Sequence, residues 1–225
     1  MTLPDRIEAT LAELARERHP DADEDVHFTE GLARTAIEAL TEPGEVVLDP
    51  FAGYGTTLAV ASRLGRRAVG VELLPERVAA IRDRVPDAVV VEGDARGLGS
   101  LTTADGEPLA APGTVALVLT SPPYMTANDH PANPLTAYET DDGDYRTYLR
   151  ELALVVAQVR ALLRPGGHLA LSVADIEHDG HRTRLVDDVT AAAARVLEPV
   201  ASVPVTWDAM PHDLVDDRLV VLRRA

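Results

Sequence analysis

One segment, running from Asp49 to Thr57, constrains the fold more than any other part of the chain. It reads Asp-Pro-Phe-Ala-Gly-Tyr-Gly-Thr-Thr, follows the apolar residues 46–48 and opens a helical pattern. An apolar run, a glycine-rich loop and a helix, in that order, predict a strand–loop–helix junction whose backbone can approach a nucleoside closely. We therefore expect an α/β protein with a parallel sheet and a nucleoside cofactor at one sheet edge.

A second segment has the same setting. Residues 120–124 read Thr-Ser-Pro-Pro-Tyr and end the apolar run 115–119. A continuous apolar run is typical of a strand that is buried on both faces of a parallel sheet. Because the carboxyl ends of parallel strands share an edge, the two segments are expected to face one crevice.

Together these segments resemble the amino-methyltransferases, S-adenosylmethionine (SAM)-dependent enzymes that methylate cytosine N4, adenine N6 or guanine N2 in DNA or RNA. In that family a DPFxGxGT loop binds SAM and an (S/D/N)PPY loop holds the amine. The resemblance implies a class I methyltransferase fold, which is a Rossmann-like, seven-stranded, mostly parallel sheet with helices on both faces. Serine at the first position of the second motif, Ser121, is associated there with cytosine N4.

The periodicity of the remaining sequence agrees with one domain over residues 1–225. Residues 1–42 are expected to form an N-terminal helical cap, and residues 125–144 a substrate loop. Strands are predicted at 45–48, 68–72, 88–92, 115–120, 168–173, 200–207 and 217–222, and helices at 4–18, 30–40, 57–64, 76–85, 145–163 and 182–197. Alternation of strand and helix predicts right-handed crossovers and a parallel sheet.

Acidic residues follow the first three predicted strands. Asp49 can accept hydrogen bonds from the methionine ammonium of SAM, and Glu72 from its ribose hydroxyls. The resemblance places Asp94 near the adenine amino group. Gly53 and Gly55 allow the backbone to approach the cofactor. The predicted cofactor-binding residues of these junctions are Asp49, Pro50, Phe51, Gly53, Gly55, Thr56, Thr57, Glu72 and Asp94.

An upstream segment, residues 27–30, resembles the family's segment that closes over the methionine part of SAM. Phe28 and Thr29 are therefore further candidates for cofactor binding. An N-capping turn with a buried Phe28 is the alternative interpretation.

The second motif has a chemical rationale. An exocyclic amine on an aromatic ring is a poor nucleophile, so its site should accept hydrogen bonds from both N–H groups. The Ser121 hydroxyl and the Pro122 carbonyl can do so, while Pro123 keeps the backbone extended and Tyr124 can stack on a flat substrate. These four residues are the predicted catalytic loop.

The polar segment after this loop is the candidate for substrate selection. Asn128, His130 and Tyr138 offer polar contacts, and five acids in the same segment would repel a phosphate backbone. No extra region for reading base edges is recognisable, which favours a partner subunit for target recognition or a small-molecule amine as substrate.

Composition excludes several other classes of site. The chain has no cysteine, so disulfides, thiolate metal sites and cysteine nucleophiles are absent. All 21 basic residues are arginine, which excludes a Schiff-base lysine. The net charge of −16 disfavours tight binding to duplex DNA. Without a long apolar run or a signal pattern, a cytoplasmic protein with no membrane partner is expected.

Two other polar clusters are interpreted as structural. Residues 175–181 contain enough acids and histidines to suggest a metal, but a polar turn is expected after a strand and SAM chemistry needs no metal, so no metal is predicted. Trp207, Asp208, His212 and Asp213 are expected at an exposed hairpin tip rather than at the mouth of the substrate site.

The leading functional hypothesis is SAM-dependent methylation of an exocyclic amino nitrogen of a nucleobase in DNA or RNA. Methylation of a small-molecule amine uses the same residues and is the first alternative. A SAM-binding accessory subunit without catalysis is the second.

Overall fold

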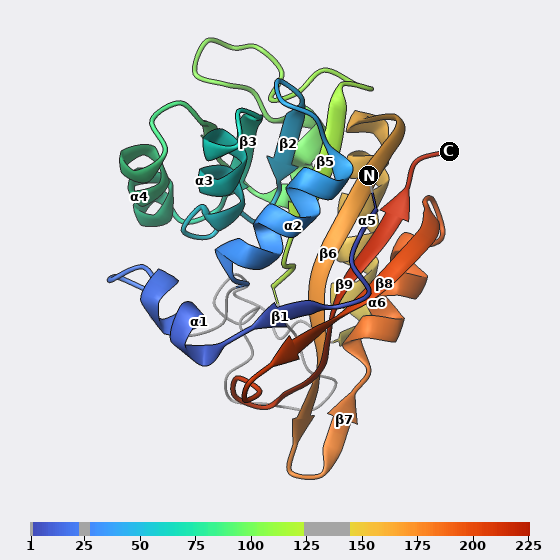
Figure 1. The fold of residues 1–225 in the computed structure, drawn as a ribbon. Coiled ribbons are helices and arrows are strands. Elements are labelled where there is room, and N and C mark those ends of the chain that lie inside the picture. Colours follow the sequence, from blue (N-terminus) through green and yellow to red (C-terminus); the bar gives the residue numbers. More distant parts are fainter. Residues whose placement is uncertain (1, 23–27, 124–144) are drawn as a thin grey trace.

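The computed structural model describes residues 2–22, 28–123 and 145–225, which build a single nine-stranded sheet (Figure 1). The strands follow the order β1-β8-β9-β6-β5-β2-β3-β4, and β7 pairs with β6 beside this path. Their bounds are β1 Ile7–Ala9, β2 Val46–Asp49, β3 Arg67–Glu72, β4 Val89–Glu92, β5 Val115–Thr120, β6 Leu163–His178, β7 His181–Thr183, β8 Glu198–Trp207 and β9 Leu214–Arg223. All pairings are parallel except those of β9 with β6 and β8 and of β7 with β6.

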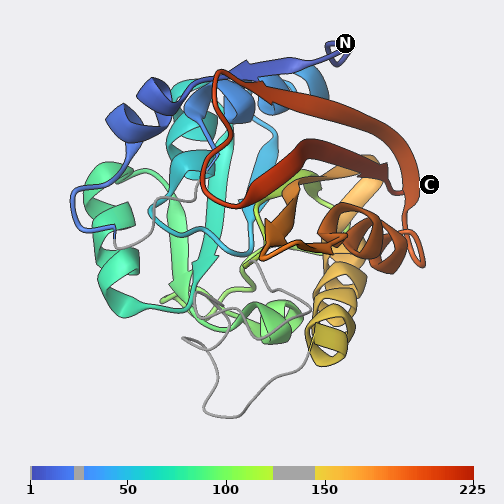
Figure 2. The same ribbon diagram turned by 90° about the horizontal axis from the view of Figure 1, so that it is seen from below.

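Helices cover both faces of the sheet, as Figures 1 and 2 show from two directions. One buried cluster joins α2, α3 and α4 to the sheet, and a second joins α5, α6 and the short 3-10 helix η1 to its other face. The helix bounds are α1 Leu11–Glu17, α2 Glu30–Leu40, α3 Thr56–Arg63, α4 Pro75–Arg84, η1 Ala95–Ser100, α5 Tyr145–Leu162 and α6 Leu185–Ala193. The predicted fold class is confirmed.

The predicted count of seven strands is wrong by two. A helix is predicted over residues 4–18, but α1 begins only at Leu11, because Thr10 caps it through the Glu13 N–H and Glu13 caps it in return. Upstream, Ile7 and Ala9 are buried and pair in parallel with the end of β8. Ile7, Leu11 and Leu14 fit one helical face, but Ile7 and Ala9 also fit the alternation of a short edge strand.

The second additional strand lies where a polar turn is expected. The strand predicted at 168–173 does not end at residue 173. β6 continues to His178 and folds back through a tight turn into β7. Asp175 is buried there and accepts hydrogen bonds from Arg182 Nε and Val186 N. Because these groups satisfy the carboxylate, a polar residue continues the strand instead of ending it.

The N-terminal region predicted as a helical cap is therefore only partly helical, since it contains β1 as well as α1 and α2. The predicted substrate loop, residues 125–144, lies outside the described residues. Among the helices of the described ranges, none is long and apolar enough to cross a membrane.

Candidate cofactor and amine site

The carboxylate of Asp49 lies at the carboxyl end of β2 and is almost completely buried. Its Oδ1 accepts from Phe51 N at 3.0 Å, and its Oδ2 accepts from Thr57 Oγ1 at 2.6 Å. Burial raises the pKa of Asp49 to about 6, although these donors oppose the rise. Asp49 is thus a preorganised acid that a cation beside it would stabilise in the ionised form.

Thr57 joins the two predicted junctions. Its hydroxyl lies 2.6 Å from Asp49 Oδ2 and 3.4 Å from the carbonyl oxygen of Leu119, two residues before Ser121. β5 pairs in parallel with β2, so both chains leave the sheet at the same edge. The glycine loop and the Ser-Pro-Pro segment therefore start side by side.

The glycine loop turns back on itself between β2 and α3. Gly55 N donates to Ala52 O at 2.7 Å, and Ala52 N donates to Val71 O of β3 at 2.9 Å. Gly53 and Gly55 adopt φ values of +54° and +82°, which favour glycine. Of the other predicted loop residues, Pro50 is buried, Phe51 packs against the core, and Thr56 is the first residue of α3.

The two glycines differ in what surrounds them. A Cβ at Gly53 meets no atom within 4 Å, whereas a Cβ at Gly55 meets Ile81 Cγ1 at 3.1 Å. We expect Gly55→Ala to lower the free energy of unfolding by about 2–4 kcal/mol, combining left-handed strain with crowding. Gly53→Ala, the matched variant in open space, should cost only about 1 kcal/mol. Urea denaturation of both variants checks this, and equal losses would contradict it.

Glu72 ends β3 and is buried beside the glycine loop. Its Oε2 accepts from Gly53 N at 2.8 Å, and its Oε1 accepts from Leu74 N at 3.0 Å. Burial raises the pKa of Glu72 against these hydrogen bonds. Each carboxylate oxygen keeps a second lone pair, which a ribose hydroxyl can use.

Asp94 occupies the position after β4 that the prediction gives it, but its carboxylate is engaged. Oδ1 accepts from Arg96 N and Oδ2 from Arg96 Nε, both at 2.8 Å, and Asp94 caps the start of η1. Although partial burial raises the pKa of Asp94, the hydrogen bonds from Arg96 lower it below its ordinary value overall. Arg96 also pairs with Glu151 of α5. A contact of Asp94 with adenine stays a prediction.

Phe28 and Thr29 precede α2. Phe28 is buried in the cluster that contains α2 and α3, and Thr29 Oγ1 accepts from Leu32 N at 3.3 Å as the N-cap. The N-capping alternative therefore describes the local structure. Cofactor contacts from these two residues stay a prediction.

The predicted catalytic loop is described up to Pro123. Ser121 and Pro123 are partly exposed and Pro122 is buried, directly after β5. Tyr124 and the substrate candidates Asn128, His130 and Tyr138 lie outside the described residues.

Sequence reasoning missed the residues that fasten the glycine loop from outside. Tyr54 stacks on His19, with ring centroids 4.4 Å apart, and Arg84 donates to the Tyr54 carbonyl oxygen at 3.1 Å. The position of Tyr54 between two glycines was visible in the sequence. Its partners lie about 30 residues away in either direction, and no local pattern indicates them.

Asp208, His212 and Asp213 are exposed in the connection between β8 and β9, as expected, but Trp207 is partly buried. It is the last residue of β8, and its indole Nε1 donates to Asp217 Oδ2 at 2.8 Å. Burial raises the pKa of Asp217 to about 6. Asp208 follows in the connection and caps α1 by accepting from Leu11 N.

The polar residues 175–181 do not form a metal centre among the described residues, where no group of three or more His, Cys, Asp or Glu side chains could hold a metal ion. His178 Nδ1 lies 2.8 Å from Asp213 Oδ2. This contact ties the β6–β7 hairpin to the residues that precede β9.

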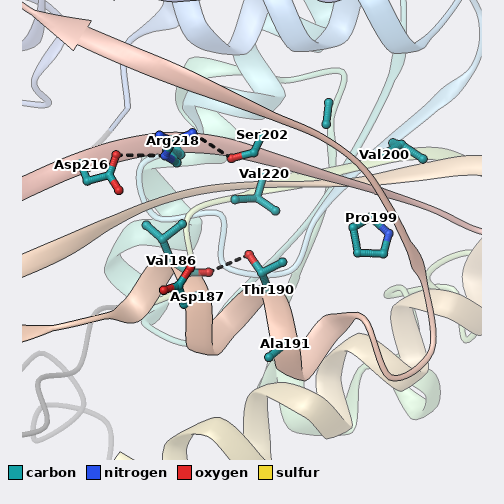
Figure 3. A pocket seen from close by; sticks show the side chains of 11 residues that line it. Val186, Asp187, Thr190, Ala191, Pro199, Val200, Ser202, Asp216, Arg218 and Val220 are labelled. Carbon is teal, nitrogen blue, oxygen red and sulfur yellow. Dashed lines mark hydrogen bonds and ion pairs between the residues drawn. The ribbon is translucent and has the colours of Figure 1, made fainter.

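A groove of about 540 Å³ lies elsewhere, between α6 and strands β8 and β9 (Figure 3). Val186, Thr190, Val200 and Val220 contribute to its walls. Asp49 and Glu72 do not line it, so it is separate from the glycine loop.

Comparisons relate the N-terminal part of the chain to known DNA methylases. Residues 12–83 match a family of DNA methylases, N6_N4_Mtase. The match contains the glycine loop and Glu72 but ends before β5. The type II methyltransferase M.XycI of Xanthomonas campestris pv. cyanopsidis is 48% identical over 62 residues, which are 26% of this chain and 21% of that protein. The chain thus matches about a fifth of the length of this relative.

Solved structures extend the likeness to the whole sheet. TrmN from Thermus thermophilus has a TM-score of 0.62 at 19% identity, over 96% of this chain and 52% of TrmN. The chain has the class I methyltransferase fold. The 1,6-didemethyltoxoflavin-N1-methyltransferase of Burkholderia thailandensis, solved with bound 1,6-didemethyltoxoflavin and S-adenosylhomocysteine, has a TM-score of 0.52 at 21% identity. That likeness covers 81% of this chain and 72% of the Burkholderia enzyme.

Proposed function

We propose that this protein is a SAM-dependent N-methyltransferase whose acceptor is an exocyclic amine, in the first instance that of a nucleobase in DNA or RNA. The observation that carries the proposal is the bridge made by Thr57, which sets the Asp49 loop beside the strand that leads into Ser121. The match of residues 12–83 to DNA methylases supports the same class of reaction.

The residues at the sheet edge fit SAM as cofactor. Asp49 supplies a buried carboxylate for the methionine ammonium, and Glu72 supplies free lone pairs for the ribose hydroxyls. The space at Gly53, where a Cβ would meet nothing, leaves the loop backbone accessible to a nucleoside. SAM has no phosphate, so a loop without a cationic side chain suits it.

The acceptor amine would be bound by the Ser-Pro-Pro segment. Ser121 Oγ and the Pro122 carbonyl oxygen accept the two N–H groups of the amine, which localises its lone pair on nitrogen. SAM supplies an electrophilic methyl group. Transfer forms the N–CH₃ bond, breaks the S–CH₃ bond, and releases S-adenosylhomocysteine and one proton to solvent. Tyr124 would shield this step from water.

One experiment tests the reaction and its substrate together. The protein is incubated with methyl-labelled SAM and separate pools of DNA, RNA and cellular metabolites, and the label is then located. Label on a base amino nitrogen supports the proposal. Label only on a metabolite amine makes the small-molecule alternative correct, and no label in any pool, with SAM bound, makes the accessory-subunit alternative correct.

Three observations favour the small-molecule alternative. The net charge is −16, and three arginines that could contribute to a basic surface are paired with acids. Arg63 and Arg84 both bind Glu30, and Arg96 binds Asp94. The Burkholderia enzyme with this fold binds a small heterocycle and methylates it at N1, as its name states.

Salt dependence separates polyanion from small-molecule binding. We expect the isolated protein to lack submicromolar affinity for duplex DNA. A protein that neutralises six or more phosphates would lose about 10³-fold or more in affinity between 50 and 200 mM salt. Fluorescence anisotropy with a labelled duplex measures this, and SAM affinity at the same salt concentrations serves as the control. Tight, salt-sensitive binding without a partner subunit would contradict the expectation and place DNA first.

A further inference from the structure

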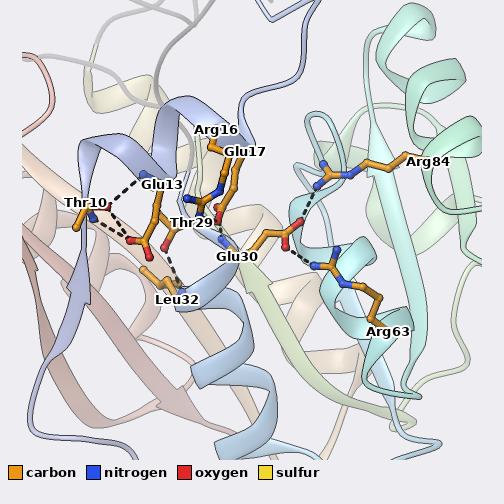
Figure 4. Close-up of polar contacts among 9 residues, drawn as sticks. All are labelled: Thr10, Glu13, Arg16, Glu17, Thr29, Glu30, Leu32, Arg63 and Arg84. Carbon is orange, nitrogen blue, oxygen red and sulfur yellow. Dashed lines mark hydrogen bonds and ion pairs between the residues drawn. The ribbon is translucent and has the colours of Figure 1, made fainter.

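A closed ring of contacts joins the end of α1, the start of α2 and the glycine loop. Glu17, the last residue of α1, accepts from Glu30 N at 2.7 Å through its Oε2. The Glu30 carboxylate in turn binds Arg84 of α4 at 2.9 Å and Arg63 of α3, as Figure 4 shows. Glu30 therefore connects four helices at the first position of α2.

Tyr54 closes the ring from the glycine loop. Its main-chain oxygen accepts from Arg84 Nη1 at 3.1 Å, and its hydroxyl donates to Asp21 O at 2.7 Å. Its ring stacks on His19 at 4.4 Å with an interplanar angle of 11°, and the Arg77 guanidinium lies 5.2 Å from the ring centre. Both the main chain and the side chain of Tyr54 are thus held by groups outside the loop.

The ring holds the residues that follow α1 and the residues that precede α2. On one side, Ala22 O accepts from Arg18 Nη2 at 2.6 Å, next to the Asp21 contact with Tyr54. On the other side, Phe28 and Thr29 are buried directly before Glu30. These are the two residues that the sequence assigns to cofactor binding outside the main junctions.

The contacts are better shielded than ordinary surface pairs. Exposed ion pairs contribute little to stability because water and salt screen them. The side chains of Glu30 and Arg84 are only 24% and 26% exposed, and Glu30 is shared by two guanidinium groups. Arg84 also joins the carboxylate and the Tyr54 carbonyl, so one guanidinium links α2 to the loop.

We infer that Tyr54 and Arg84 are positioning residues that hold the chain around Phe28 and Thr29 against the glycine loop and thereby slow the release of the cofactor. The inference rests on the proposed SAM site. The side chains of Tyr54 and Arg84 contact other protein groups, whereas the cofactor would touch the loop backbone. The inference therefore concerns how long the cofactor stays bound and not a direct contact with it.

The test measures dissociation of S-adenosylhomocysteine, which has no methyl group to transfer, by stopped-flow displacement. Tyr54→Leu and Arg84→Met are expected to raise the dissociation rate constant about tenfold, with association rate constants within about twofold of wild type. Tyr54→Phe keeps the stacking and loses only the hydroxyl contact, so a smaller rise of about threefold is expected. This mild variant is the one to use where larger changes impair folding.

The matched control is Arg34→Met. It removes an exposed Arg–Glu pair from α2, the helix that begins with Glu30. It should leave the dissociation rate unchanged. Hydrogen exchange of the cofactor-free protein gives a second readout, since Tyr54→Leu should speed exchange at Asp21, Ala22 and Glu30. Faster exchange with unchanged dissociation would assign the ring a purely structural role and overturn the inference, as would no change in either. Failure of the wild-type protein to bind S-adenosylhomocysteine would instead refute the proposed cofactor.

Discussion

Ser121→Ala is expected to lower the rate of methyl transfer by about 10²-fold or more while the Kd for S-adenosylhomocysteine stays within about twofold. The loss is large because the hydroxyl acts on the amine as charge develops on nitrogen, and fixed polar groups at such a position contribute about 10²–10³ in rate. Cofactor affinity is retained because Ser121 follows β5, whereas Asp49 and Glu72 lie on β2 and β3. Single-turnover rates and calorimetry measure the two effects separately.

Ser100→Ala is the matched control for this prediction. Ser100 ends η1, is exposed, and donates only to Gly97 O. It should change neither rate nor affinity. A loss of cofactor affinity in Ser121→Ala as large as the loss of rate would make the Ser-Pro-Pro segment a structural turn. Full activity of that variant would contradict the proposed amine-binding mechanism.

The parallel part of the sheet could be predicted because each element carries its own pattern. β5, Val115–Thr120, is buried at every position, and its residues 115–119 appear in the sequence as an uninterrupted apolar stretch. α2 was predicted at its observed bounds, since Thr29 is an N-cap residue and the apolar positions recur with helical spacing. Such local signals need no knowledge of distant residues.

Pairing between distant residues could not be predicted in this way. β1 is a strand only because the end of β8, about 200 residues later, offers it an edge. β6 continues through Asp175 only because Arg182 and Val186 satisfy that carboxylate. In both places the local sequence permits more than one structure, and tertiary contacts select one of them.

The same distinction applies to the candidate site. Asp49, Gly53 and Glu72 belong to short motifs, so their placement at one sheet edge followed from the strand order. The residues that contact Asp94 and Tyr54 could not be predicted in the same way. Arg96 engages the Asp94 carboxylate, and the Tyr54 contacts come from segments before α2 and at the end of α4. A motif identifies the groups that meet a ligand, but packing decides how firmly they are held.

Asp49→Asn is expected to weaken SAM binding by about tenfold or more, because a hydrogen bond between charged groups contributes about 1.5–3 kcal/mol. Asparagine preserves the shape of the side chain and an acceptor for Thr57. The matched control is Asp217→Asn. Asp217 is similarly buried, its pKa is also raised to about 6, and it lies on β9, away from the glycine loop. It should leave SAM affinity within about twofold. Equal effects in the two variants would remove Asp49 from the site.

The pH dependence of SAM binding provides a second, independent test of the role of Asp49. Burial raises the pKa of Asp49 to about 6 in the cofactor-free protein, and only the ionised carboxylate attracts the ammonium group of SAM. Binding therefore requires proton release below pH 6, so affinity should rise as the pH increases from 5 to 6 and level off above about 7. Titration calorimetry at several pH values measures this rise. Asp49→Asn should lose that part of the rise, whereas Asp217→Asn should keep it, because the proton that leaves on binding belongs to the carboxylate at the end of β2. A pH profile identical in wild type and Asp49→Asn would show that another group binds the ammonium.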